Sequence, residues 1–203
     1  MMSRLHRYFV LALVVSGAAL LSGCRDTPWE EWPAGRLAPH PPVQSSVSAV
    51  SVHVKGDWTI RPIAQFEVEA LVLSREPYYV DATASISPVD LALGWGGMSD
   101  PAVLRRLDIW QAGRFMFWET DDVLPIPKKE IIRSSANMHM IPASEEVEAV
   151  LDEVKPGDVV RITGALVFAS TEGGYTWRSS MTRTDTGDGA CEIVWVEQID
   201  IVG

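Results

Sequence analysis

The residues with the clearest chemical potential are a cysteine and a histidine far apart in the chain. Cys191 is one of two cysteines among 203 residues, and a thiolate becomes a good nucleophile beside a base or a positive charge. His139 precedes Cys191 in the chain, and Asn137 lies two residues before His139. If the fold gathers these side chains, the imidazole can take the proton of the thiol. The alternative is that Cys191 is a small buried residue at the start of a strand.

The order of this pair is similar to that of sortases, which hold a cysteine and a histidine on a β-barrel. The chain departs from the sortase pattern on both sides of the cysteine. Asp188-Gly189-Ala190 replaces a threonine-rich approach, and no Lys or Arg follows Cys191 to supply the family's arginine. An enzyme that acts on envelope polymers through His139, with Asn137 or Cys191, therefore stands as the alternative function.

Met138-His139-Met140 is a candidate copper site, because thioether sulfurs favour Cu(I). On a strand the two methionines share one face and His139 points to the other, so His53 would have to supply the imidazole. The group resembles the sites of small periplasmic copper carriers, although Ser135 stands where those carriers have a tryptophan. A Cu(I) carrier is thus the second alternative function. The competing interpretation is that both methionines belong to the core and that His139 is a surface or hydrogen-bonded residue.

Other segments offer less complete sets of groups. The motifs H-E-x-x-H, paired C-x-x-C and C-x-x-C-H are absent, which argues against zinc catalysis and covalent haem, and no cofactor is predicted. Residues 185–189 lack the EF-hand spacing of acids, so a turn is expected there. The loop 94–100 surrounds Trp95 with glycines, and that ring either tucks under the domain or reaches a ligand. Trp95, Asp90 and His139 are the candidate ligand-contacting residues.

Hydrophobic periodicity describes the elements that must position these groups. Apolar residues at every second position predict strands over 66–73, 115–118, 160–168 and 193–201, and Gly173-Gly174 predicts a hairpin return into 175–178. Helix-start signals predict a helix from Ser144 to about 154, another over 100–107, and a third that begins at Ser87-Pro88.

These elements predict a mainly β domain with short helices. Many short strands favour a small antiparallel barrel. Residues 156–164, a tight turn followed by a strand with a glycine where it bends, resemble the entry into a strand of OB-type barrels. Segments 87–96 and 135–139 also resemble stretches of uncharacterised bacterial β-rich proteins, a resemblance that implies a shared domain and no activity.

The first residues are typical of an export signal. Arg4 and Arg7 precede a run without charge from Tyr8 to Leu21, which is short for a permanent membrane span. The following Leu21-Ser22-Gly23-Cys24 resembles the lipobox of bacterial lipoproteins, whose cysteine receives diacylglycerol. The resemblance implies a signal peptide over 1–23, lipidation at Cys24 and a membrane anchor.

The next segment, 24–50, is rich in proline and serine and predicts a tether that holds the domain away from the membrane. Trp29 and Trp32 lie either at the lipid interface or on the domain. The domain itself is expected over 51–203. Loss of residues 1–23 removes two arginines and no acid, so the formal charge changes from −10 to −12.

A charge of this sign argues against a general nucleic-acid binder. We therefore expect a lipid-anchored envelope protein, facing the periplasm or the cell exterior, whose acidic domain binds a protein partner or a small ligand. Arg25 rather than an aspartate follows the lipidated position, which favours the outer membrane over the inner one. No catalytic set is complete in the sequence.

Overall fold

The computed structural model describes residues 27–47, 51–182 and 191–203. The strands are β1 (Val43–Ser45), β2 (His53–Lys55), β3 (Trp58–Pro77), β4 (Val89–Gly94), β5 (Asp108–Ala112), β6 (Phe115–Glu119), β7 (Ser135–Pro142), β8 (Val159–Thr171), β9 (Thr176–Arg178) and β10 (Glu192–Ile201). The helices are η1 (Gly96–Ser99), α1 (Pro101–Leu104), α2 (Lys128–Arg133) and α3 (Glu145–Glu153). The prediction of a mainly β chain with short helices is confirmed.

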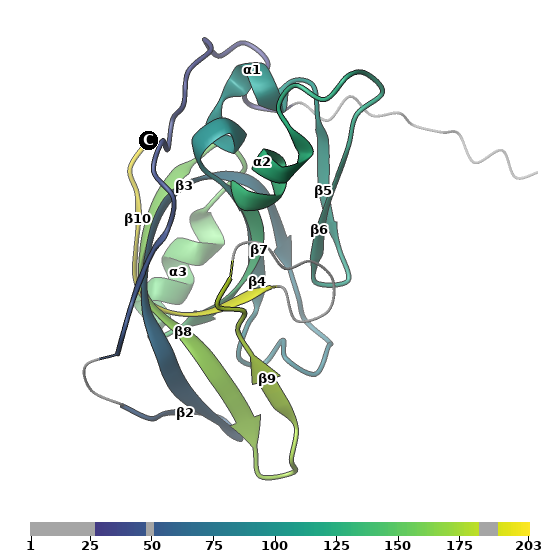
Figure 1. Cartoon of the computed structure of the whole chain (residues 1–203). Helices are drawn as coiled ribbons and strands as arrows, with labels where there is room; N and C mark the ends of the chain where they lie inside the picture. Colours follow the sequence, from purple (N-terminus) through teal and green to yellow (C-terminus); the bar gives the residue numbers. More distant parts are fainter. Residues whose placement is uncertain (1–26, 48–50, 183–190) are drawn as a thin grey trace, which may run out of the picture.

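The large sheet is built around β3, which curves strongly and pairs with β4 at one edge and β8 at the other (Figure 1). From β4 the pairing continues through β7 and β10 to β8, and β8 pairs again with β3. The β7–β10 pair is parallel, so the expectation of a wholly antiparallel sheet is wrong at this pair. An OB-like barrel stays a prediction.

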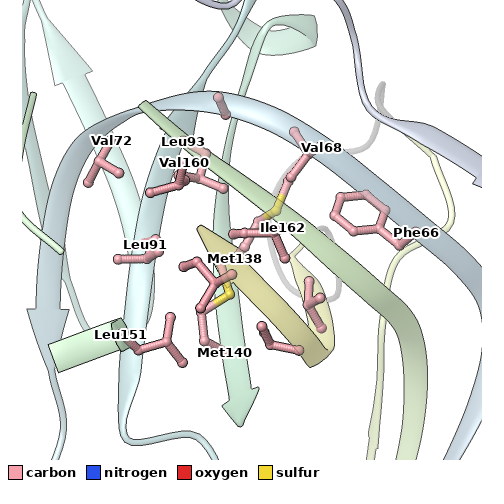
Figure 2. Close-up of a cluster of buried hydrophobic side chains, with 14 of the residues drawn as sticks. Phe66, Val68, Val72, Leu91, Leu93, Met138, Met140, Leu151, Val160 and Ile162 are labelled. Carbon is pink, nitrogen blue, oxygen red and sulfur yellow. The ribbon is translucent and has the colours of Figure 1, made fainter. Parts of the chain in front are cut away.

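The concave side of this sheet holds the largest apolar cluster. Every second residue of β7 faces it, so that Met138 and Met140 lie among Leu91, Val160 and Leu151 (Figure 2). The pattern follows from the two-residue period of a strand. Helix α3 adds Val147 and Leu151 to the same cluster.

Two further apolar clusters lie on the convex side. One joins β3 and β4 to η1, α1, α2 and the β5–β6 hairpin, through residues such as Leu73, Leu104 and Ile131. The other covers β8, β10 and the end of β7, through residues such as Val167, Trp195 and Ile141. The β5–β6 hairpin forms a separate small sheet, so side-chain packing and polar contacts hold it in place.

Two of the expected helices are present and one is wrong. Asp100 caps α1 by accepting a hydrogen bond from the Ala102 N–H, and Ser144 caps α3 in the same manner. The segment expected to be a helix after Ser87-Pro88 is instead β4, which is buried along its whole length. Tertiary pairing with β3 and β7 satisfies the β4 backbone and overrides the local helix-start signal.

The expected tether also differs in the part that the structure describes. Trp29 is 3% exposed and packs beside Leu71 and Val159, so it lies on the domain rather than at a lipid interface. Residues 43–45 form β1 and pair with β3. The Leu37 N–H also donates to the Ser99 carbonyl oxygen, so residues 27–47 contact the domain along this segment.

Several expectations fall on residues outside the described ranges. These are the export signal, the lipobox with Cys24, and the turn at 185–189. Within the described ranges, no helix has the length and apolar character needed to cross a bilayer.

Gly164 on β8 leaves no room for a side chain against the backbone of β10. A Cβ atom on Gly164 would lie 2.0 Å from the Trp195 carbonyl oxygen, next to the irregular register between Val196 and Gln198. Backbone atoms cannot yield as a flexible side chain can, so the glycine allows this close crossing of the two strands.

We expect Gly164→Ala to lower the free energy of unfolding by several kcal/mol, on the order of an overpacked core site. Gly173→Ala is the matched control, because its Cβ would meet nothing closer than 3.7 Å. Urea denaturation of both variants measures the difference. Equal stability of the two would contradict the close approach described above.

Candidate functional site

A polar strip interrupts the convex face of β4 and β7 between its two apolar clusters. Asp90 on β4 lies directly opposite His139 on β7, and Asn137 precedes His139 on the same face. Their strand neighbours Leu91 and Met138 point into the concave cluster, as the two-residue period requires. Asp90 is 0% exposed and His139 is 3% exposed. The Asp90 carboxylate is therefore buried, and its neighbours are positively charged or uncharged side chains.

Arg114 balances the charge of Asp90. Its guanidinium lies 2.7 Å from Asp90 Oδ1 and 2.8 Å from Asp81 Oδ2, and it also donates to the Ser87 carbonyl oxygen at 3.0 Å. The carbon centre of the guanidinium sits 3.8 Å from the centre of the Tyr78 ring. An arginine bridges two carboxylates in this way because its donors diverge in one plane.

Arg114 occupies the tip of the β5–β6 hairpin in a strained conformation. The two residues between the strands, Gly113 and Arg114, have φ values of 58° and 72°, as in a type I′ turn. Arginine rarely adopts this left-handed region, which costs about 1–2 kcal/mol. The contacts with Asp81 and Asp90 hold the side chain in place and offset that strain.

The carbonyl oxygen of Arg114 joins two other candidate residues. It accepts a hydrogen bond from Asn137 Nδ2 at 2.9 Å and a longer one from Cys191 Sγ at 3.8 Å. Asn137 also donates to Asp90 Oδ2 at 3.1 Å and accepts from Gln111 Nε2 at 2.6 Å. Asn137 therefore orients the Asp90 carboxylate and ties the hairpin to β7.

His139 is held by its Nδ1 atom. That atom lies 2.9 Å from Asp90 Oδ1, but the ring is turned so that the contact is electrostatic rather than a well-aligned hydrogen bond. The Trp177 ring of β9 lies against the imidazole, with 4.8 Å between ring centres. Nδ1 is buried and has no well-aligned hydrogen bond, and the ring lines a recess of the surface.

A recess opens beside these groups. It has a volume of about 640 Å³, and its walls include Asp81, Thr83, Arg114, His139, Trp177 and Cys191. We call it the Arg114 pocket. Cys191 is partly exposed there, and Phe115 and Tyr175 add aromatic surface. The pocket thus combines apolar walls with a few convergent polar groups, which is the usual composition of a small-molecule site.

Two neighbouring groups have shifted pKa values. Burial first and the Asp90 carboxylate second raise the pKa of Tyr78 above its usual range, so its hydroxyl stays protonated while it accepts from the Arg114 N–H at 3.0 Å. Burial acts to raise the pKa of Asp81. Hydrogen bonds from Thr83 and the Arg114 guanidinium outweigh this effect, and the pKa of Asp81 is lowered overall. Asp81 therefore stays ionised and neutralises part of the Arg114 charge.

A second recess of about 550 Å³ lies near Trp32, Leu37 and Val159, with the Glu69–Arg161 ion pair on its wall. Its lining has no histidine and no cysteine. The Arg114 pocket therefore holds the chemically richer set of groups.

No protein-family model, curated protein or solved structure matches this chain. Its function must therefore be argued from the geometry of the site.

The structure brings together some of the residues expected from the sequence. Asp90, Asn137, His139 and Cys191 share one site, as the enzyme alternative requires. Asn137 and His139 lie on a regular strand and not in an irregular loop. Trp95 does not belong to the site, because it is 2% exposed and packs in the concave cluster; its glycine neighbours allow it to tuck under the sheet.

The copper candidates are not gathered. Met138 and Met140 are 0% exposed inside the concave cluster, whereas the His53 ring stacks on Trp195 at 4.4 Å, in the cluster of the convex side. The two-residue period of β7 turns His139 away from both sulfurs. The structure therefore does not bring Met138, Met140 and His53 together.

Sequence reasoning missed the residues that complete the site. Arg114 and Asp81 are ordinary charged residues in the sequence, and Gln111 and Trp177 lie far from His139 along the chain. The available signal was local: Gly113-Arg114 between two aromatic-rich strands indicates a tight hairpin, and an arginine at its tip is unusual. Nothing in the sequence identifies Asp90 as its partner.

We expect Arg114→Ala to lower the free energy of unfolding by about 3–5 kcal/mol, because it leaves the Asp90 carboxylate buried without its cation. Alanine at φ 72° keeps the backbone strain of arginine, so the loss reports the ion pairs. Chemical denaturation followed by tryptophan fluorescence measures it.

Arg106→Ala is the control, since Arg106 pairs with Asp122 on the exposed surface and such a pair contributes about 1 kcal/mol or less. Adding Asp90→Asn to Arg114→Ala should recover part of the loss. If Arg114→Ala costs no more than Arg106→Ala, Asp90 does not depend on Arg114.

Proposed function

We propose that this chain is a lipid-anchored protein of the bacterial cell envelope whose acidic β-rich domain binds a small ligand in the Arg114 pocket. The observation that carries the binding proposal is the pocket itself. It is recessed and has aromatic walls, and the buried Asp90–Arg114–Asn137 network supports its floor. A recess of about 640 Å³ can enclose a small molecule. A protein partner with a flat surface would fill it less well.

The pocket also indicates what kind of ligand it accepts. Trp177 and Phe115 offer flat apolar surface, while Thr83 and His139 offer polar atoms on other walls. Arg114 is engaged by Asp81 and Asp90, so it is poorly placed to bind a second full negative charge. An uncharged molecule with one flat group and one polar group therefore fits best.

The anchoring half of the proposal rests on the sequence. Positive charge, an apolar run and Leu21-Ser22-Gly23-Cys24 occur in the order that lipoprotein signals have. Arg25 favours delivery to an outer membrane. The domain then begins within a few residues of the anchor, because packed side chains start at Trp29. The domain would therefore lie close to the lipid surface rather than at the end of a long tether.

An enzyme acting on envelope polymers is the second candidate function. It is favoured by one specific observation, namely that His139, Asn137 and Cys191 meet around the Arg114 carbonyl and the Asp90 carboxylate.

We expect Cys24→Ala to abolish incorporation of labelled palmitate when the full chain is produced in a bacterial host, because the thiol is the acceptor of the lipid. Cys191→Ala should keep the label, since that cysteine lies in the domain. Labelled palmitate in Cys24→Ala at the level of the natural sequence would remove the anchoring half of the proposal.

For the binding half, phenylacetamide serves as an uncharged probe with one flat group. We expect it to shift the imidazole NMR signal of His139, which lines the pocket, and not that of His53, which stacks on Trp195 elsewhere. Trp177→Ala should weaken the affinity about tenfold, or about 1.4 kcal/mol. Trp32→Ala, in the other recess, should leave it unchanged. Equal shifts of the His139 and His53 signals, or no shift of either signal, would contradict ligand binding in the Arg114 pocket.

A further inference from the structure

We propose that Cys191 is a nucleophile that accepts an acyl group from an activated ester, with His139 as its proton acceptor and Asp90 as the residue that positions the imidazole. This inference deepens the proposed function, since it rests on the Arg114 pocket being a ligand site. It adds the substrate class and assigns a role to each group.

The first support is the shared pocket. Cys191 and His139 belong to different strand regions, yet both line the same recess. The parallel pairing of β7 and β10 explains why, because His139 lies beside Ile193, two residues after Cys191. Residues two apart on a strand face the same side. Cys191 therefore emerges on the face of the sheet that carries His139.

The second support is the state of His139. Its side chain is 4% exposed, and Asp90 Oδ1 lies 2.9 Å from the buried Nδ1. His139 lines the pocket, and Asp90 occupies the Nδ1 side of its ring, so Nε2 is the ring nitrogen left for a group bound in the pocket. A nearly buried imidazole with one nitrogen beside a carboxylate and the other directed away from it is arranged as a general base.

The third support is the electrostatic balance. When the imidazole takes a proton, the positive charge forms 2.9 Å from Asp90 Oδ1, which stabilises the ion pair of thiolate and imidazolium. Arg114 and Asn137 hold the same carboxylate, so its position is set before any substrate binds. Preorganised charge of this kind is effective because little reorganisation accompanies the reaction.

The reaction can be written with all atoms placed. His139 Nε2 takes the thiol proton, and Cys191 Sγ forms a bond with the carbonyl carbon of the ester. The carbon–oxygen bond to the leaving alcohol breaks, and the alcohol oxygen receives the proton from His139. A thioester on Cys191 remains. Water or a second alcohol then attacks the thioester carbon and gives its proton to His139. The carbon–sulfur bond breaks, and His139 returns that proton to Cys191 Sγ as the acid or new ester leaves.

The test uses the full chain and p-nitrophenyl acetate. We expect acetylation of the peptide that contains Cys191, read by mass spectrometry after proteolysis, together with release of one nitrophenolate per chain in an initial burst. Peptide mapping keeps any adduct on Cys24 separate. Cys191→Ser should abolish the Cys191 adduct.

His139→Gln should slow acetylation of Cys191 by about 100-fold, the contribution expected of a general base. His53→Gln is the matched control, because His53 stacks on Trp195 away from the pocket, and its rate should equal that of the natural chain. Since His139→Gln removes a buried partner of Asp90, circular dichroism should verify that the variant is folded.

A second measurement does not depend on that variant. The rate of Cys191 alkylation by iodoacetamide in the natural chain should fall only slightly between about pH 8.5 and 6.5. An ordinary thiol, with a pKa near 8.5, falls about 50-fold over that range. A fall of that size, or acetylation at the same rate in His139→Gln and His53→Gln, would overturn the proposal.

Failure of this proposal can be separated from failure of the proposed function. Phenylacetamide has no activated leaving group, so its effect on the His139 signal reports binding alone. If that shift remains while Cys191 behaves as an ordinary thiol, the pocket binds a ligand and Cys191 is not its nucleophile. If both are absent, both proposals are wrong.

Discussion

The buried carboxylate of Asp90 is the constraint on which the rest of the site depends. A lone carboxylate at 0% exposure would cost several kcal/mol, so the fold must supply a cation and hydrogen-bond donors around it. Arg114 comes from a hairpin that has no strand pairing with the main sheet, and Asn137 comes from β7. The ion pair between Arg114 and Asp90 therefore adds to the side-chain packing that holds the hairpin, and it places the tip of the turn beside β4.

The same constraint explains why strain is present at the tip of the hairpin. A tight turn with positive φ at both central positions ordinarily contains glycine or asparagine, yet Arg114 stands at the second of them. The Arg114 side chain starts there, extends over Tyr78 and bridges Asp81 and Asp90. The contacts with two carboxylates offset the conformational cost of about 1–2 kcal/mol, and they hold Arg114 in the wall of the pocket.

The sequence predicted the parts of the molecule that a local pattern controls. The two-residue period placed Met138 and Met140 on one face and His139 on the other, and helix caps at Asp100 and Ser144 predicted α1 and α3. The helix predicted after Ser87 failed because β3 and β7 pair with that segment on both sides. The pairing of Arg114 with Asp90 also joins residues far apart in the chain, and a single sequence carries no signal for such a contact.

Stability and chemistry cannot be separated at this site, because both use the same carboxylate. Asp90 accepts from Arg114 to keep the hairpin in place, and it lies 2.9 Å from His139 Nδ1. The Arg114 carbonyl, whose position the ion pair fixes, also accepts from Cys191. The hairpin tip thus contacts Cys191 directly through its carbonyl oxygen and reaches His139 through the Asp90 carboxylate. A change at Arg114 is therefore expected to alter both the stability of the hairpin and the geometry of these two pocket residues.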